Sequence, residues 1–220
     1  MGQKTELLKK IKDEVVTLKE SPLYADRIKN NVFPVIGEGR HDAKIIFIGE
    51  APGRNEAATG KPFCGAAGQV LTELIESIGL KREDVYITNI VKDRPPNNRD
   101  PLPEEIRIYA PFLDRQIEII QPKVVATLGR YSMAYIMSRF LGNRGSSMAM
   151  PSGQNNSDSP FNTDGSLKTI SQIHGKVFDA KVSYGNVKVV PLYHPAVALY
   201  QNSLKQQMFE DFKAINNFLT

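Results

Sequence analysis

Four side chains that could share one chemical task follow or face the ends of short apolar runs. Glu50 follows KIIFIG, Asn89 lies near the end of DVYITNIV, His194 follows VKVVPLY, and Phe63 lies in a loop after the first run. Around one cavity, such groups would suit a flat heterocycle. The aromatic ring can stack on it, the amide can read its hydrogen-bonding edge, and the imidazole can support negative charge on its oxygen.

Each of these residues also has an ordinary structural explanation. A glutamate in a turn is usually solvated, an asparagine there can bond the backbone, and a single histidine or phenylalanine is most often structural. His41 and His174 are interpreted in that structural way. The joint occurrence of the other four at predicted strand ends favours a site, because parallel strands end at one edge of a sheet.

The apolar pattern predicts a fold that alternates strands with helices. Buried-type strands are predicted at residues 45–48, 84–91, 123–129 and 187–193. Helical spacing of apolar residues is found at 4–19, 67–78, 103–120, 130–141 and from residue 204 onward. Such alternation predicts an α/β protein, a three-layer α/β/α fold with a central four-stranded parallel sheet.

Composition favours a single domain over residues 1–220. The chain is long enough for a sizeable core, and no linker divides its 220 residues into halves. Residues 142–168 are rich in glycine, serine and asparagine without periodicity, which predicts a mobile loop. The single cysteine, Cys64, excludes an internal disulfide and any metal site built from several cysteines.

No part of the sequence predicts a membrane protein. No apolar run approaches the roughly 18 residues that a spanning helix needs, and the N-terminus is charged throughout. We therefore expect a soluble, cytoplasmic protein. The net charge of +4 and the pI near 9.0 are compatible with a polyanionic partner but do not establish one.

Several motifs, in order along the chain, resemble those of the family 4 uracil-DNA glycosylases. They are GEAPG, GKPFCGAAGQVL, ITNIVKDRPPNNRDPLPEE, PFLDRQIEIIQPKVVATLG and PLYHPAVAL. The resemblance covers roughly residues 22–141 and 174–215. It implies an enzyme that flips uracil out of DNA and hydrolyses its N-glycosidic bond, which starts base excision repair.

The resemblance also implies which residues carry the reaction. His194 would stabilise the uracil anion as it leaves through O2, and Glu50 would lie near the sugar and the attacking water. Glu56 matches an acidic position of the first motif and is the third catalytic candidate. For uracil binding, Phe63 would stack on the base and Asn89 would pair with its edge. The Ala51 backbone would line the same pocket.

DNA containing uracil is the expected partner, bound by a monomer. Extrusion of a base from the duplex costs a few kcal/mol and leaves a gap that an apolar side chain can fill. By the resemblance, Val197 and Leu199 are the candidates for that task. Three cations on the proline-rich loop are expected to hold phosphates. They are Lys92, Arg94 and Arg99.

The sequence departs from the family at the four cysteines that bind a [4Fe–4S] cluster in most members. The corresponding positions hold Leu18, Ser21, Asp93 and Tyr109. We therefore expect no cluster, no other metal and no cofactor. In its place we expect an apolar plug of Leu18 and Tyr109, rimmed by Ser21 and Asp93, with Asp93 pairing with Arg94 or another nearby base.

Two alternatives remain open at the level of sequence. One is a glycosylase for another deaminated base, such as hypoxanthine or xanthine. The other is a weakly catalytic module that binds DNA or abasic sites, which Ala57 suggests because the family commonly has an aspartate at that position.

Overall fold

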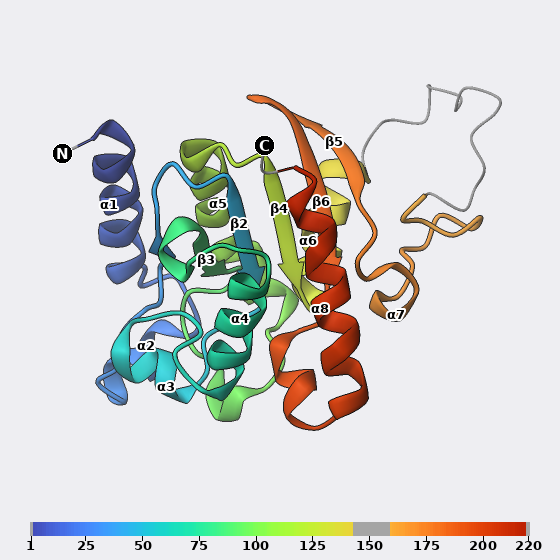
Figure 1. Cartoon of the computed structure of the whole chain (residues 1–220). Coiled ribbons are helices and arrows are strands. Elements are labelled where there is room, and N and C mark those ends of the chain that lie inside the picture. Colours follow the sequence, from blue (N-terminus) through green and yellow to red (C-terminus); the bar gives the residue numbers. More distant parts are fainter. Residues whose placement is uncertain (1, 143–158, 219–220) are drawn as a thin grey trace.

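A six-stranded sheet forms the centre of the computed structural model, which describes residues 2–142 and 159–218 (Figure 1). The order of its strands is β1-β3-β2-β4-β6-β5. Their bounds are β1 Glu38–Gly39, β2 Ile45–Gly49, β3 Tyr86–Asn89, β4 Val124–Leu128, β5 Phe178–Val182 and β6 Gly185–Leu192. Most of the loop that we expected to be mobile, residues 143–158, lies outside the described residues.

The four central strands are parallel, as predicted. β3 pairs with β2, β2 with β4, and β4 with β6, and in the first of these pairs Gly49 lies opposite Asn89. The two edge strands are antiparallel and were not predicted. β1 is only two residues long, and β5 alternates buried and exposed side chains as the first strand of a hairpin with β6.

Helices cover both faces of the sheet (Figure 1). Among the described residues the five predicted helices are present, and three short ones were missed because they contain too few residues to show a period. The bounds are α1 Gln3–Val16, α2 Tyr24–Lys29, α3 Arg54–Thr59, α4 Ala66–Ser77, α5 Pro103–Ile120, α6 Arg130–Leu141, α7 Ile170–Ile173 and α8 Asn202–Asn216.

Alternate side chains of β2 build two separate cores. Ile46 and Ile48 belong to the core under α1, α5 and α6, whereas Ile45 and Phe47 belong to the core under α4 and α8. On the second face the rings of Phe47 and Phe212 stack with centroids 5.6 Å apart. A strand buried on both faces reads as a continuous apolar run, which explains why β2 was visible in the sequence. Within the described ranges, no helix has the length and apolar character to cross a bilayer.

A buried polar cluster ties the N-terminal segment to the loop after β3. The Tyr109 hydroxyl lies 2.7 Å from Ser21 Oγ and donates to Asp93 Oδ2 at 2.6 Å, and Arg27 pairs with Asp93 at 2.9 Å. Arg27 also donates to the carbonyl oxygen of Val15 near the end of α1. The cluster therefore joins α1, α2, α5 and the loop.

The expectation for these four positions is confirmed in part. Three of them meet through hydrogen bonds, and Asp93 pairs with a nearby base, which is Arg27 and not Arg94. Leu18 is only partly buried against the core that contains Tyr109. A buried carboxylate needs donors around it, and the tyrosine hydroxyl and the guanidinium provide them.

Tyr109→Phe tests this cluster because it keeps the ring and removes only the hydroxyl. Loss of the hydrogen bonds to Asp93 and Ser21 should lower the free energy of unfolding by about 1–3 kcal/mol. Tyr135→Phe is the matched control, because its hydroxyl donates to Asp114 at a partly exposed site and should contribute less. Urea denaturation of the parent and of both variants measures these free energies of unfolding. Equal melting of the parent and Tyr109→Phe would show that the hydroxyl does not stabilise the fold.

Candidate functional site

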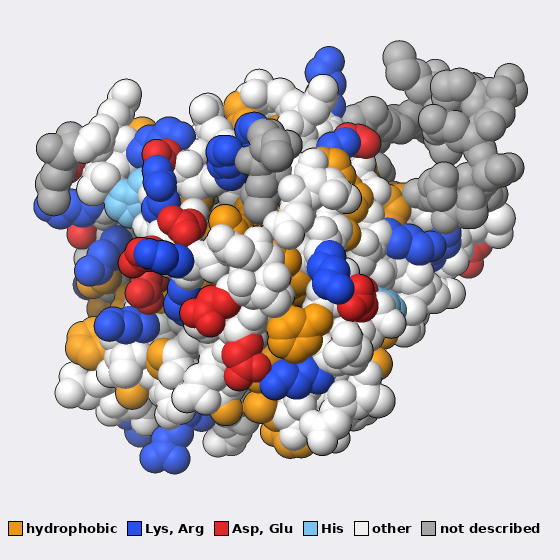
Figure 2. Space-filling view, in the orientation of Figure 1, with side chains coloured by type: hydrophobic (Ala, Val, Ile, Leu, Met, Phe, Trp, Pro, Cys, Tyr) orange, Lys and Arg blue, Asp and Glu red, His pale blue; other side chains and the backbone are white. Residues whose placement is uncertain are grey.

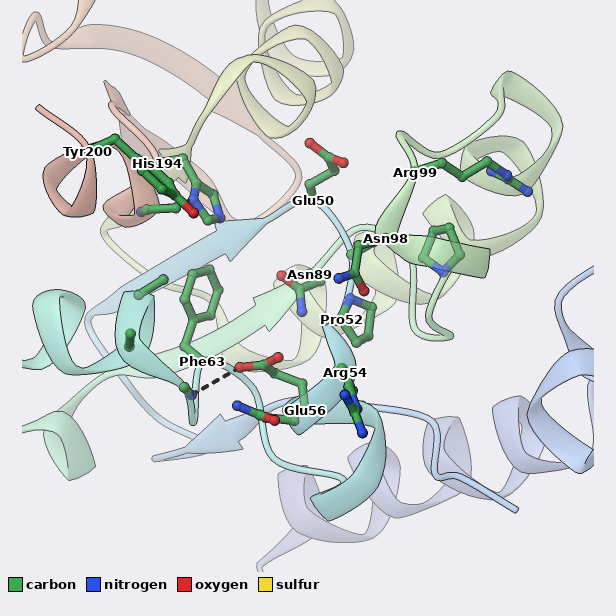
Figure 3. A pocket seen from close by; sticks show the side chains of 18 residues that line it. Glu50, Pro52, Arg54, Glu56, Phe63, Asn89, Asn98, Arg99, His194 and Tyr200 are labelled. Atoms are coloured by element: carbon green, nitrogen blue, oxygen red, sulfur yellow. Dashed lines mark hydrogen bonds between the residues drawn. The ribbon is translucent and has the colours of Figure 1, made fainter. Parts of the chain in front are cut away.

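A cavity of about 710 Å³ opens at the carboxyl ends of the parallel strands. Glu50 follows β2, Asn89 ends β3, His194 follows β6, and Phe63 comes from the loop that leads into α4. All four side chains line the cavity, as expected from the sequence (Figure 3). Its volume lies within the range of small-molecule pockets.

Asn89 presents an unused hydrogen-bond acceptor in this cavity. The residue is 2% exposed, and its Oδ1 has no hydrogen-bond partner among the described residues. Gly49 makes room for it, because a Cβ at that position would lie 2.3 Å from Asn89 Oδ1 and 2.7 Å from Phe63 Cζ. A buried polar atom without a partner is costly, so it marks a place where a ligand can donate.

Phe63 is held in a strained loop against the start of α4. Its φ of +47° is uncommon for a phenylalanine, and such conformations often occur at functional sites. The loop approaches α4 so closely that a Cβ on Gly68 would lie 1.7 Å from the Phe63 carbonyl oxygen. The ring is 7% exposed, and its centroid lies 5.6 Å from that of His194. The two rings thus form adjoining walls of the cavity.

The tautomer of His194 follows from its local contacts. Pro195–Leu199 form a 3-10 turn directly after it, and the Ala196 N–H donates to His194 Nδ1 at 3.2 Å. Burial lowers the pKa of His194, while the Glu56 carboxylate opposes this shift. At neutral pH the ring is therefore uncharged. Because Nδ1 accepts, Nε2 carries the proton and can donate it to a ligand.

Glu50 has an unusual proton affinity. Burial raises its pKa to about 7, Asp100 adds repulsion in the same direction, and Arg130 opposes both. Arg130 and Asp100 also pair with each other at 2.5 Å. A carboxylate with a pKa near neutrality, placed at the edge of a cavity, is typical of a functional site.

Glu56 organises the loop that carries Phe63. Its Oε1 accepts a hydrogen bond from the backbone N–H of Cys64 at 3.0 Å. It accepts a second one from the backbone N–H of Gly65 at 3.2 Å (Figure 3). Glu56 also lines the cavity. Its expected catalytic role stays a prediction. The neighbouring Ala57 is 1% exposed and is not among the lining residues. The side chain of Ala57, where the family commonly has an aspartate, therefore does not form part of the cavity wall.

The proline-rich loop offers fewer cations to DNA than we expected. Lys92 is fully buried and cannot reach a phosphate, so that prediction is wrong. Arg99 forms a bidentate pair with Glu105, with its Nη2 at 2.6 Å from Oε1, and points away from the cavity centre (Figure 3). Arg99 therefore anchors the loop to the first turn of α5.

A second hollow adjoins the cavity and contains the cations that are better placed. Arg54 lines both spaces. Arg94 lines the second one and donates at 2.6 Å to Asn98, which lines the first. Neither guanidinium has a carboxylate within ion-pair distance in the part of the chain that the structure describes. Elsewhere, as Figure 2 shows for one face, cationic and acidic side chains are interspersed. Arg54 was missed in the sequence, although it directly follows the GEAPG turn.

The turn after His194 carries the two residues expected to fill the gap in the duplex, and that expected role stays a prediction. Val197 is partly buried and Leu199 is 45% exposed, but neither lines the cavity. Tyr200, which the sequence reasoning missed, lines the cavity beside His194 and is 86% exposed (Figure 3). Together with the neighbouring Leu199 it forms an exposed apolar surface beside the mouth of the cavity.

The residues at the expected iron–sulfur positions do not fit such a cluster. A cluster is held by thiolates, and those positions contain a leucine, a serine, an aspartate and a tyrosine. Across residues 2–142 and 159–218, no three histidine, cysteine or acidic side chains are grouped so that they could hold a metal ion.

Comparison with known proteins gives a consistent result. The family model of the uracil DNA glycosylase superfamily matches residues 36–220. A type-4 uracil-DNA glycosylase of Sulfurisphaera tokodaii is 44% identical over 209 residues, covering 94% of this chain and 83% of the relative. One of Archaeoglobus fulgidus is 41% identical, covering 96% and 92%, and one of Thermotoga maritima is 36% identical, covering 100% and 98%.

The charge on Glu50 can be followed by NMR of the carboxyl carbon in the free protein. We expect a midpoint near pH 7, so that Glu50 is protonated below it and ionised above it. Asp100→Asn should lower the midpoint, because it removes a repelling charge, and Arg130→Met should raise it. Glu50→Gln identifies the resonance by removing it. A midpoint near the ordinary value of about 4.3 would contradict this description of the site.

Proposed function

Because the chain belongs to the uracil DNA glycosylase superfamily as a type-4 uracil-DNA glycosylase, we propose that the cavity is its uracil pocket. The enzyme hydrolyses an N-glycosyl bond and thereby starts base excision repair. In our proposal Asn89, Phe63 and His194 hold the extruded base, and Glu50 acts at the sugar. The unused buried acceptor of Asn89 is the observation that carries this assignment.

Asn89 would distinguish uracil from cytosine. Uracil presents an N3–H donor beside its O4 acceptor, so the carboxamide can accept with Oδ1 and donate with Nδ2. Cytosine presents the reverse pattern, with an acceptor at N3 and a donor at its amino group. In a buried site such a mismatch leaves polar atoms unpaired, which discriminates more strongly than a difference in size.

His194 would stabilise the departing base. When the glycosidic bond breaks, its electron pair stays on uracil N1 and the negative charge spreads to O2. A neutral imidazole that donates from Nε2 can bind this charge more strongly in the transition state than in the ground state. One such preorganised donor contributes about 3–4 kcal/mol. The hydrogen bond from Ala196 N–H to Nδ1 supports this assignment, because a neutral ring that accepts at Nδ1 carries its proton on Nε2.

Glu50 would act on the other fragment. Departure of uracil leaves an electron-poor sugar carbon, which water attacks from the opposite face while losing a proton. An ionised Glu50 can stabilise the cationic sugar and accept that proton. Since its pKa is raised to about 7, the active fraction increases as the pH rises through this value.

Tyr200 and two arginines would hold the surrounding DNA. An exposed ring can stack on a neighbouring base, because every base has a π face, and such stacking contributes about 1–3 kcal/mol per base. We assign the contact with the vacated position to Tyr200, with Leu199 beside it. Arg54 and Arg94 in the adjoining hollow are placed to contact phosphates. Arg99 was also expected to contact a phosphate, but its charge is already paired with Glu105, so we expect it to bind DNA less strongly than Arg54 and Arg94 do.

Hypoxanthine is a second candidate substrate. Its N1–H donor and O6 acceptor repeat the pattern of uracil N3–H and O4, so an amide that reads one edge can read the other. The cavity volume of about 710 Å³ can also admit a purine. The amide therefore selects uracil over cytosine but does not by itself exclude hypoxanthine.

We also propose, from the sequence alone, that the enzyme works as a monomer in the cytoplasm.

Single-turnover excision from uracil-containing oligonucleotides tests the pocket. His194→Ala should lower the rate by about 100- to 1,000-fold, and Asn89→Asp by tens of fold or more, because each removes a matched hydrogen bond to the base. Binding of a cleavage-resistant 2′-fluorodeoxyuridine duplex should change much less for His194→Ala. His41→Ala and exposed Asn186→Asp serve as controls. Parent-like rates in both pocket variants would show that the base binds elsewhere.

The lack of tryptophan in this chain allows a direct test of Tyr200. In Tyr200→Trp the single indole should be quenched when it stacks against a duplex containing a tetrahydrofuran abasic site. Phe33→Trp provides a matched control, since Phe33 is 58% exposed and does not line the cavity. If the two indoles respond equally to the abasic duplex, Tyr200 does not contact the vacated position.

A further inference from the structure

Lys92 is the least expected residue near the cavity. It is fully buried, and it lies three residues after Asn89 at the start of the proline-rich loop. Its ammonium has no carboxylate partner in the described parts of the chain, yet it contacts three oxygen atoms. They are Asn89 O at 2.6 Å, Gln116 Oε1 at 2.6 Å and Thr88 Oγ1 at 2.8 Å. Lysine is rarely buried unless its charge is compensated, so a specific role for this side chain is expected.

The three oxygens match the three donors of an ammonium. The Thr88 hydroxyl donates its own proton to Ile36 O at 2.7 Å, so it can only accept from Lys92. The amide nitrogen of Gln116 donates to Ile36 O at 2.9 Å and to the Tyr86 hydroxyl, which turns Oε1 toward Lys92. Burial lowers the pKa of Lys92. The three oxygens around Nζ provide an acceptor for each N–H of an ammonium.

The place of this contact is set by the end of the sheet. Ile90 N donates to Gly49 O of β2, so the backbone groups of the preceding residue, Asn89, point to the other side of β3. On that side β1 pairs only with Tyr86 and Ile87, and it does not extend as far as Asn89. The Asn89 carbonyl therefore has no neighbouring strand, and Lys92 Nζ provides the missing donor.

We propose that Lys92 is a positioning residue that fixes the Asn89 carboxamide for reading the base. This inference rests on the proposed part of Asn89 in the uracil pocket. The N–H of the same peptide is held by its bond to Gly49 O, so without Lys92 the peptide after Asn89 would be fixed on the β2 side only. A tilt of its unpaired carbonyl would then displace Oδ1 from the base edge. Recognition needs such groups to be held within about 0.5 Å, which the ammonium achieves by joining β3 to Gln116 of α5.

A double-mutant cycle separates this function from a general effect on the fold. Lys92→Met removes all three donors while keeping an unbranched side chain. It should lower the single-turnover rate on uracil DNA by at least about tenfold, with binding of the duplex changed by less than about threefold. In an Asn89→Ala background the same change should lower the rate by less than about twofold, because the group that Lys92 positions is already absent.

A second variant keeps the test decisive if Lys92→Met does not fold. Thr88→Val removes one acceptor from the ammonium and preserves the shape of the side chain. It should lower the rate by a few fold in the parent and have no further effect in Asn89→Ala. Thr127→Val is the matched control, since Thr127 is equally buried on β4 and its hydroxyl has no hydrogen-bond partner among the described residues. Its rate should equal that of the parent.

The outcomes distinguish the inference from the proposal on which it rests. A parent-like rate in Asn89→Ala would overturn the assignment of Asn89 itself. A strong loss in Asn89→Ala, combined with equal losses from Lys92→Met in both backgrounds, would leave the pocket in place and overturn the positioning function of Lys92. The same conclusion would follow from a parent-like rate in a folded Lys92→Met variant. For Thr88→Val, equal losses in both backgrounds would likewise contradict the inference.

Discussion

The parallel pairing of β2 with β3, which sets Gly49 opposite Asn89, is the constraint on which the site depends. It places the carboxamide of one strand over a residue without a side chain on the next, and Phe63 fills the remaining space above Gly49. A shift of one residue would turn Asn89 to the opposite face of the sheet. The pocket is therefore a property of the register of the sheet, and the surrounding loops complete it.

The loops around this sheet are held by polar contacts, of which one is partly exposed and one is buried. Glu56 fixes the loop that carries Phe63 through two backbone N–H groups. The Arg27–Asp93 pair fixes the loop after β3 to the N-terminal helices. Buried ion pairs stabilise little relative to apolar side chains of similar size, and we infer that these contacts instead favour a single arrangement of the loops. We interpret them as the reason that the cavity walls have a defined geometry in this protein.

The sequence predicted the parallel core and the four converging side chains, because strands buried on both faces and their polar ends leave local patterns. It did not predict β1, whose pairing depends on tertiary contacts alone. It placed Lys92 on the surface, since a basic residue in a proline-rich loop gives no sign of the acceptors that surround it. Tyr200 was missed for a similar reason, because exposure beside a cavity becomes visible only once the chain is folded.

The most direct test of this account is a crystal structure of the protein soaked with free uracil. The account predicts that uracil N3–H lies within hydrogen-bond distance of Asn89 Oδ1 and O2 within that distance of His194 Nε2. The base should also stack on Phe63. Uracil bound outside this cavity, or bound within it while Asn89 Oδ1 keeps no partner, would contradict the account.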